Sequence, residues 1–207
     1  KWEIVRSEDM SSSGFQDVDV SLTTRELARM IKQAGIDFRS LPDEAADNPL
    51  GEYSGAGTIF GATGGVMDAA LRSAYYLVTG KNPDPDAFSS VRGMQGWKEA
   101  SFDIPGAGTV RTAVVSGLGN AEKLIQRIKG GEHFDFVEVM ACPGGCINGA
   151  GQPFVHKAEK QARSNGLYDA DRMCSIKSSE ENPLIESLYN GILKGREHEL
   201  LHVEYNK

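Results

Sequence analysis

The chain has 207 residues, of which 40% are hydrophobic, 25% charged and 8% aromatic, a composition that is typical of a folded globular protein and excludes collagen, a long coiled coil and general disorder. Its 22 Lys and Arg stand against 29 Asp and Glu, which gives a formal net charge of −7, and because both signs are interspersed no nucleic-acid partner is expected. No apolar run approaches the roughly 18 residues that cross a bilayer, and the N-terminus has neither an initiating Met nor a signal-peptide pattern, so we expect no membrane span and a chain that begins within a longer protein.

The first half of the chain is predicted to contain one short strand and two helices. The strand candidate is 18–22, and a capping box directly after it indicates a helix over 24–34. Prolines and glycines interrupt 40–58, which predicts a long irregular segment, and loops of this length are usually functional. A glycine-rich turn then precedes apolar residues at helical spacing, which predict a helix over 67–80.

The second half contains the pattern of a strand, a helix and a strand. Strands are predicted at 110–115 and 134–140, with a helix between them that Asn120 caps. Such a βαβ unit makes the two strands parallel and places the residues after the second strand at the carboxyl end of the sheet, where ligands bind. Further helices are expected over 154–162 and from 182 onward. The predicted class is α/β or α+β, with a small, mostly parallel sheet, flanking helices and long glycine-rich loops.

Two of the three cysteines, Cys142 and Cys146, lie in a glycine-rich loop directly after the second predicted strand. Soft ligands on a backbone that can wrap closely suit the ligation of an iron-sulfur cluster by thiolates. A tetrahedral zinc site would need two more N or S ligands, and no motif stands where it could supply them. The alternative is a pair of reduced structural cysteines in a turn. The density of glycines and the neighbouring Met140 favour the cluster.

Three other motifs receive a structural interpretation. His198, Glu199 and His202 satisfy the zinc-protease pattern H-E-x-x-H, but too few residues follow for a further helix with a third ligand, so a packed C-terminal segment is expected. The turn at 61–65 lacks the spacing of a phosphate-binding loop and is interpreted as a tight packing turn. Cys174 has no partner at useful spacing and is interpreted as a packed side chain.

The stretch over 138–153 resembles the third cluster-binding signature of iron-only ([FeFe]) hydrogenases, Glu-x-Met-x-Cys-Pro-x-Gly-Cys-x-x-Gly-Gly-Gly-Gln-Pro, with Ala150 in place of one glycine. A second stretch, 60–72, also resembles this family, with Asp68 where Glu is usual. Shorter segments resemble the family at 17–20, 23–28 and 50–57. The similarity covers nearly the whole chain. It implies that residues 1–207 are the C-terminal portion of the large-subunit catalytic domain.

The resemblance implies an H-cluster, in which a [4Fe-4S] cubane held by four cysteines is bridged through one of them to a two-iron subcluster that makes or splits H₂. By motif position, Cys142 would be a cubane ligand, and Cys146 both a ligand and the bridge. Met140 would pack beside the two-iron centre, and Phe60 would wall the same pocket. The position of Glu3 resembles the last residue of another family signature, Met-Pro-Cys-x-x-Lys-x-x-Glu.

The family's other two cubane cysteines lie in that signature and in a Thr-Ser-Cys-Cys-Pro signature, both N-terminal to the matched segments, and neither cysteine is present here. The resemblance therefore implies a fragment of a hydrogenase that catalyses reversible proton reduction, with two cluster cysteines and one wall of the pocket, and inactive alone. The implied partner chain is the N-terminal remainder of the domain, and the implied substrates are H₂ and protons. Electrons would be exchanged with a ferredoxin-like donor, or with iron-sulfur or flavin subunits in NAD(P)-linked chemistry. A cytoplasmic, anaerobic setting is expected, with the periplasm as the alternative.

A second interpretation is a non-catalytic iron-sulfur scaffold or sensory relative that binds only a [4Fe-4S] cluster. Such a descendant has less reason to keep the side chains that surround the two-iron centre. Because Met140 and Phe60 are both present, the catalytic interpretation is favoured.

Overall fold

The computed structural model describes residues 4, 8–11, 14–45, 47 and 51–202. The chain divides into two compact units. The first unit comprises residues 1–47, 151–154 and 188–207, and the second comprises 48–150 and 155–187. Glu3, a predicted site residue, lies outside the described residues.

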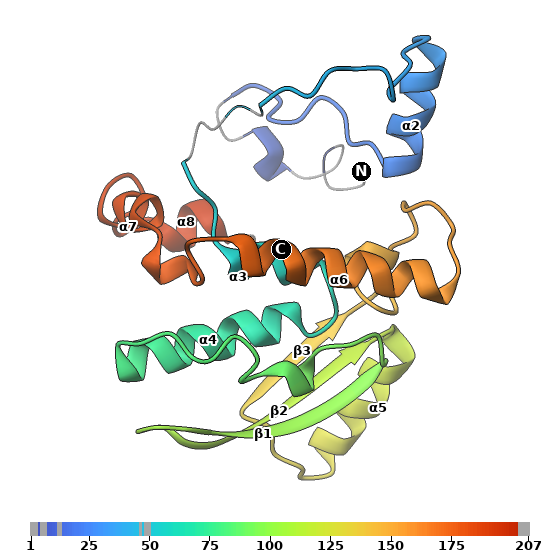
Figure 1. The fold of residues 1–207 in the computed structure, drawn as a ribbon. Coiled ribbons are helices and arrows are strands. Elements are labelled where there is room, and N and C mark those ends of the chain that lie inside the picture. The colour runs from blue at the N-terminus through green and yellow to red at the C-terminus, as the bar shows by residue number, and fades with distance from the viewer. Residues whose placement is uncertain (1–3, 5–7, 12–13, 46, 48–50, 203–207) are drawn as a thin grey trace. The chain divides into compact units, whose positions relative to one another are not determined.

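A three-stranded sheet is the centre of the second unit, with the strand order β1-β2-β3 (Figure 1). Its strands are β1 (Trp97–Ile104), β2 (Gly108–Ser116) and β3 (Phe136–Met140). β2 and β3 are parallel, which confirms the predicted βαβ unit, whereas β1 forms an antiparallel hairpin with β2. The sheet is therefore mixed and not mostly parallel as expected. The hairpin was missed because β1 is rich in polar residues and carries little of the apolar signal that marked the other two strands.

Helix α5 (Leu118–Lys129) connects β2 to β3 and covers one face of the sheet (Figure 1). Its N-cap residue is Gly117, so the prediction that Asn120 caps this helix was wrong. The Asn120 side-chain amide instead donates to the carbonyl oxygens of Gly96 at 3.0 Å and Ser116 at 2.9 Å. Asn120 thus ties the start of α5 to the end of β2 and to the segment before β1.

The two faces of β2 pack against different helices because alternate side chains point in opposite directions. Ala113 and Val115 pack with Leu124 of α5, whereas Val114 packs with Met67 and Leu71 of α4 (Gly65–Thr79). All three β2 side chains have 0% exposure. A strand buried on both faces reads as a continuous apolar run, which is why this strand was predictable from sequence.

Helices α3 and α6 complete the second unit. Helix α3 (Gly55–Thr58) and the 3-10 helix η2 (Ile59–Gly61) lie partly in the segment that was expected to be irregular. Helix α6 (Lys157–Met173) starts later and runs further than the predicted 154–162. Ile59, Ala62 and Tyr168 form a separate buried cluster that packs η2 and the following turn against α6. The remaining short helices are η3 (Ser89–Val91), η4 (Cys146–Asn148) and η5 (Ser179–Glu181).

A buried ion-pair network joins α4 to α6 and to the segment after η3. Asp68 on α4 accepts hydrogen bonds from Arg72 Nε at 2.9 Å and from Arg92 Nε at 2.7 Å. Arg72 also binds both carboxylate oxygens of Asp171 on α6 at 2.8 Å. Asp68, Arg72 and Asp171 are 0%, 5% and 6% exposed. A bidentate, fully paired arrangement is the one that offsets the desolvation of buried charges.

Helix α7 (Pro183–Asn190) begins at the predicted proline. The side-chain oxygen of Asn182 accepts the Leu184 amide at 3.0 Å and caps its first turn.

The first unit contains the capping-box helix. Helix α2 (Thr24–Gln33) has the predicted reciprocal bonds, with the Glu26 amide donating to Thr23 Oγ1 at 3.2 Å and the Thr23 amide to Glu26 Oε2 at 2.8 Å. None of its residues is buried. Residues 18–22 form no strand, so that prediction was wrong, because a β-prone sequence needs a neighbouring strand to pair with. The other described helices of this unit are η1 (Glu8–Ser11) and α8 (Glu197–Leu201).

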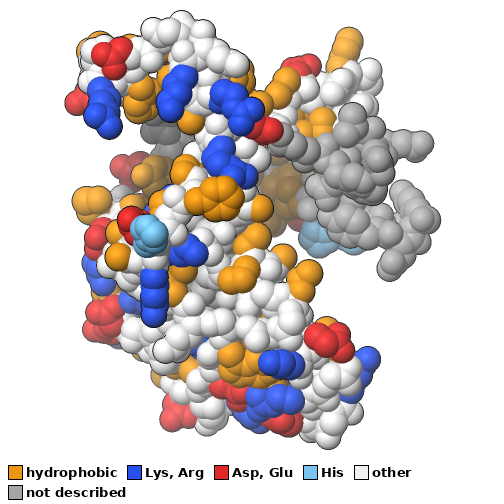
Figure 2. Space-filling view, turned by 90° about the vertical axis from the view of Figure 1, so that its right-hand side faces the viewer, with side chains coloured by type: hydrophobic (Ala, Val, Ile, Leu, Met, Phe, Trp, Pro, Cys, Tyr) orange, Lys and Arg blue, Asp and Glu red, His pale blue; other side chains and the backbone are white. Residues whose placement is uncertain are grey.

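Many large hydrophobic side chains remain exposed, among them Leu77, Leu118 and Met173 of the second unit at 72%, 68% and 82%. Figure 2 shows hydrophobic side chains at the surface among charged ones on the face that it presents. Within the described residues, no helix has the length and apolar character that crossing a membrane requires.

Asp68→Ala should lower the free energy of unfolding by about 3 kcal/mol or more, because it removes a fully buried carboxylate and leaves the Nε of the buried Arg72 without its partner. Urea unfolding followed by circular dichroism measures this change. The matched control is Asp169→Ala, which removes an exposed partner of Arg172 and should cost less than about 1 kcal/mol. Equal losses in the two variants would contradict the structural role of the network.

Candidate functional site

The two motif cysteines lie in the loop that follows β3, at the carboxyl end of the parallel strand pair. Cys142 is half-buried and Cys146 is exposed, and neither is in a disulfide. The loop turns tightly, because the Gly145 amide donates to Cys142 O and the Gly149 amide to Cys146 O, each at 3.0 Å. These bonds fold the chain back on itself around the two thiols.

Three glycines make this turn possible. Gly144 and Gly145 have φ of +86° and +93°, in the region that residues with a side chain rarely adopt. Gly149 returns beside the first thiol, since a Cβ at that position would lie 3.9 Å from Cys142 Sγ. The glycine density that suggested a wrapping backbone from the sequence therefore corresponds to a backbone that wraps close to the Cys142 sulfur.

The cysteine loop rests on the turn that precedes α4. The Thr63 amide donates to Gly144 O at 3.1 Å, and the Gly144 amide donates to Ser116 Oγ at 3.1 Å. Gly145 approaches so closely that a Cβ there would lie 2.7 Å from both Gly61 O and Thr63 N. The structure thus brings together the two stretches, 60–72 and 138–153, that carry the sequence signal.

Two predicted pocket residues flank this contact. Phe60 lies in η2, directly before the turn, with 46% of its surface exposed. Met140 is the last residue of β3, is half-buried and accepts the Gly117 amide at its carbonyl at 2.8 Å. Their segments meet, but the roles of Phe60, Met140, Cys142 and Cys146 toward a cluster remain predictions.

Glu138 and Lys98 are buried charges behind the same turn, and sequence reasoning missed both as functional residues. Glu138 Oε1 and Oε2 accept the amides of Gly64 at 2.7 Å and Met67 at 2.8 Å. A carboxylate at this position satisfies amides that have no partner within the helix and interacts favourably with its dipole. Burial lowers the pKa of Lys98 to about 8, while the negative charge of Glu138 acts in the opposite direction. Glu138 is the first residue of the 138–153 motif, and that position was the sequence signal that could have identified it. No sequence pattern marked Lys98.

The donor set fits one half of a [4Fe-4S] site. A cubane requires four thiolates, and this loop offers two soft donors on a backbone that wraps closely around one of them. In the part of the chain that the structure describes, no group of three or more His, Cys, Asp and Glu side chains could hold a metal ion. The residues present therefore fit two of the four positions of such a cluster, which would need two further thiolates.

The zinc-protease pattern does not form a hydrolytic site. His198 and His202 approach each other, with their Nδ1 atoms 2.8 Å apart. Glu199, the residue that would act as the base, is instead paired with Arg196. Cys174 donates its thiol to Ala170 O at 3.3 Å, which agrees with its interpretation as a structural side chain.

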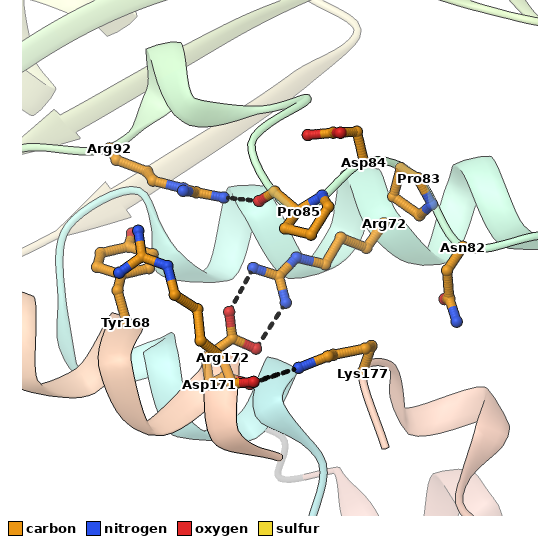
Figure 3. Close-up of a pocket in the computed structure, with 10 residues that line it drawn as sticks. All are labelled: Arg72, Asn82, Pro83, Asp84, Pro85, Arg92, Tyr168, Asp171, Arg172 and Lys177. Atoms are coloured by element: carbon orange, nitrogen blue, oxygen red, sulfur yellow. Dashed lines mark hydrogen bonds and ion pairs between the residues drawn. The ribbon is translucent and has the colours of Figure 1, made fainter. Parts of the chain in front are cut away.

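A pocket of about 220 Å³ lies next to the ion-pair network, between α6, the α4 helix and the connector after it (Figure 3). Its charged lining includes Arg72 and Asp171, which bind each other, and Lys177, which donates to the main-chain oxygen of Asp171 at 2.8 Å. Neither Cys142 nor Cys146 lines this pocket. Its charges are used within the fold, so the cysteine loop remains the candidate site.

Comparisons with known proteins show the family of the chain. The family model of the iron only hydrogenase large subunit, C-terminal domain, matches residues 1–150, and that of the iron hydrogenase small subunit matches residues 157–207. The NADP-reducing hydrogenase subunit HndD of Solidesulfovibrio fructosivorans is 46% identical over an alignment of 213 positions, which covers 100% of this chain and 36% of HndD. The periplasmic [Fe] hydrogenase large subunit of Nitratidesulfovibrio vulgaris is 53% identical over 156 residues, which are 75% of this chain and 37% of that protein.

Structural similarity leads to the same family. The apo [FeFe]-hydrogenase HydA1 of Chlamydomonas reinhardtii has a TM-score of 0.74 and 39% identity, over 96% of this chain and 58% of that chain. A more distant relative is the cytosolic iron-sulfur assembly component 3 of Mus musculus, which is 30% identical over 92% of this chain and 42% of its own length. The chain thus spans little more than a third of the length of HndD.

Gly145→Ala should separate the cysteine loop from the turn on which it rests, because the new Cβ would meet Gly61 O and Thr63 N at 2.7 Å. The matched control is Gly131→Ala, which has a φ of +97° but nothing within 4 Å of the new Cβ. Both glycines have a positive φ, so both variants carry backbone strain of roughly 1–3 kcal/mol. The steric clash should cost Gly145→Ala about 1–3 kcal/mol more in urea unfolding. Equal effects would show that the two loops do not depend on this contact.

Proposed function

Since this chain belongs to the family of the iron-only hydrogenase large subunit, C-terminal domain, we propose that it is part of a hydrogenase that catalyses the reversible reaction 2H⁺ + 2e⁻ to H₂. The observation that carries the proposal is the pair of thiols in a glycine-built loop at the carboxyl end of β3, seated on the second stretch that resembles the family. Loop and turn come from segments far apart in the chain, and the fold brings both family motifs to one place.

In this proposal Cys142 and Cys146 would hold a [4Fe-4S] cubane, and Cys146 would also be the ligand shared with the two-iron subcluster of an H-cluster. The bound cluster supplies the electron-transfer and proton-reducing chemistry. The exposure of Cys146 and the partial burial of Cys142 support the assignment, since a bridging thiolate has to reach beyond the loop. Glu3 keeps its proposed place as the last residue of a further family signature.

The other residues of this chain shape the site without binding metal. Met140 and Phe60 are proposed to pack beside the two-iron centre, where a thioether and an aromatic ring exclude water without adding charge. Both lie next to the contact between loop and turn, at the end of β3 and in η2. The tight turn around Cys142 limits access of water to that side of a cluster, which is one of the factors that set its reduction potential.

The remaining cluster ligands are proposed to come from the N-terminal remainder of the hydrogenase domain. The chain spans 36% of the length of HndD, and its own loop fits two of the four cubane positions. Residues 1–207 then form one portion of that domain, with 157–207 corresponding to the small-subunit family. The isolated chain is proposed to be inactive, and exposed apolar side chains such as Leu118 support burial against a partner segment.

The electron partners are proposed to be a ferredoxin-like protein, or iron-sulfur or flavin subunits that link the site to NAD(P). The name of HndD, an NADP-reducing hydrogenase subunit, supports the second route. The proposed compartment is the cytoplasm, and because a periplasmic relative exists, cell fractionation of the native host decides between the two.

The alternative is an iron-sulfur scaffold that carries a [4Fe-4S] cluster without the two-iron centre. The cytosolic iron-sulfur assembly component of mouse, at 30% identity, supports this possibility. The higher identity to HndD, 46%, and the presence of Met140 and Phe60 support the catalytic proposal. The two functions differ in one measurable property: only the catalytic protein evolves H₂.

Cys146→Ser, made in the longer protein that contains this chain and matured anaerobically, should lower H₂ evolution by about 100-fold or more, because it removes a ligand that both parts of the cluster share. Hydrogen evolution with reduced methyl viologen measures the change. The matched control is Cys174→Ser, which replaces a thiol bonded to Ala170 O and should leave the rate unchanged. Retained activity in Cys146→Ser would contradict the bridge, and a wild-type protein with a cubane but no H₂ evolution would favour the scaffold.

A further inference from the structure

Lys98 presents its ammonium to a site that matches it closely. The side chain is 6% exposed, and its Nζ donates to Gly93 O at 2.8 Å, to Thr63 O at 3.1 Å and to Thr63 Oγ1 at 3.4 Å. Three oxygens thus face the three N–H donors of the ammonium. A lysine is almost never fully buried unless it is paired, and most lysines lie at the surface in contact with water. The burial of Lys98 therefore indicates a structural role for its charge.

Strand register explains how Lys98 and Glu138 face the same turn. Lys98 on β1 and Glu138 on β3 both pair with Val114 on β2, from its two sides. Neighbouring side chains in one row across a sheet point to the same face, so the lysine and the glutamate both point toward the start of α4, where Val114 packs with Met67. Adjacent strands lie about 4.8 Å apart, and β2 separates β1 from β3. Lys98 and Glu138 are therefore two strand spacings apart, which leaves room for the backbone of the turn between their charged groups.

The ammonium of Lys98 binds a carbonyl oxygen, and the carboxylate of Glu138 binds the amide of the same peptide unit. Lys98 holds the carbonyl oxygen of Thr63, and Glu138 holds the amide of Gly64, which is the next residue. One peptide unit is therefore fixed at its oxygen by a cation and at its nitrogen by an anion. Such charge-assisted bonds are roughly twice as strong as neutral ones.

The clamped segment is the one on which the cysteine loop rests. Thr63, whose oxygen Lys98 binds, donates its amide to Gly144 O at 3.1 Å. Gly144 stands midway between the two cysteines in the sequence, and Gly145 packs directly against Gly61 and Thr63. An unbroken series of bonds thus runs from the buried ammonium to the backbone between the proposed cluster ligands.

We propose that Lys98 and Glu138 are positioning residues of the cysteine loop, which clamp the Thr63–Gly64 peptide and thereby hold Cys142 and Cys146 in the arrangement that cluster binding requires. The part that concerns the cluster rests on the proposed function. The clamp itself is a property of this chain's own residues. It holds with or without metal.

The structure gives each charge a distinct task in the clamp. Glu138 fixes the first turn of α4 through Gly64 and Met67, so its loss frees the start of the helix. Lys98 connects the turn to Gly93, after η3, and so fixes the side that faces the cysteine loop. Glu138 is the titratable group that acts on Lys98, whereas Thr63 and Gly93 offer it neutral oxygens.

The three cysteines of the chain provide a local test with an internal reference. Lys98→Met keeps an apolar stem of similar length and removes the ammonium, and iodoacetamide labelling of the metal-free chain is followed by mass spectrometry. The labelling rate of the half-buried Cys142, divided by that of Cys174, should rise about tenfold, the factor that loss of a hydrogen bond to a charged group implies. Cys146 is already exposed, so its ratio should rise less. Cys174 caps the carboxyl end of α6 and bonds to Ala170 O, so its labelling reports global loosening.

Matched variants separate the clamp from a general effect of removing charge. Lys123→Met removes an exposed lysine from α5 and should leave both ratios unchanged. Glu138→Gln keeps the size of the side chain but removes its charge, and should raise the Cys142 ratio as Lys98→Met does. An equal rise at all three cysteines, or unchanged ratios in both clamp variants, would overturn the proposal.

A measurement on the unmodified chain does not depend on any variant folding. Because the pKa of Lys98 is lowered to about 8, its ammonium loses a proton between pH 7 and 9. The amide resonances of Thr63 and Gly64, whose peptide the ammonium binds, should then shift with a midpoint near pH 8, while that of Gly131, which lies in open space, should not. Amides of Thr63 and Gly64 that do not respond over this range would overturn the clamp. Neither measurement involves a cluster, so failure here is distinct from failure of the hydrogenase proposal.

Discussion

The hydrogen bond from the Thr63 amide to Gly144 O is the contact on which the candidate site depends. It joins two turns that are 81 residues apart in the chain, and it forms only because Gly145 has no side chain to keep them apart. Each turn adjoins a different structural element: one precedes α4, and the other follows β3. The sheet and its covering helices therefore act as the frame that sets the distance between the two turns.

Buried charge is the second constraint, and it concentrates around α4. Asp68, Arg72 and Asp171 fix the helix to α6, while Glu138 and Lys98 fix its first turn to the sheet. Each of these groups costs desolvation energy and is stable inside the protein because partners with good geometry surround it. An apolar interface could hold α4 against the sheet. Directional hydrogen bonds also fix the rotation of the helix about its axis and the position of its N-terminus, and the cysteine loop rests on the turn at that N-terminus.

The cysteine loop has the features of one side of a site. Cys142 is half-buried and Cys146 is exposed, hydrogen bonds hold the backbone of the loop on its buried side, and the two thiols fit two of the four positions of a cubane. A loop that is rigid on its buried side and open on its other side can receive ligands from a second segment without rearranging. Membership of the iron-only hydrogenase family, together with a length of 36% of HndD, agrees with such a division of the site.

Features with local causes could be predicted from the amino-acid sequence: helix α2 from its capping box, α4 and the βαβ unit from apolar periodicity, and the cysteine loop from its glycines. The hairpin of β1, the position of Asn120 and the partners of the buried charges depend on contacts that form only in the folded chain. Glu138 lies 74 residues from Gly64, and Arg72 lies 99 residues from Asp171. A periodic pattern reports which side of an element is buried, but a buried charge is stable only beside its partner, and that partner becomes a neighbour only when the chain has folded.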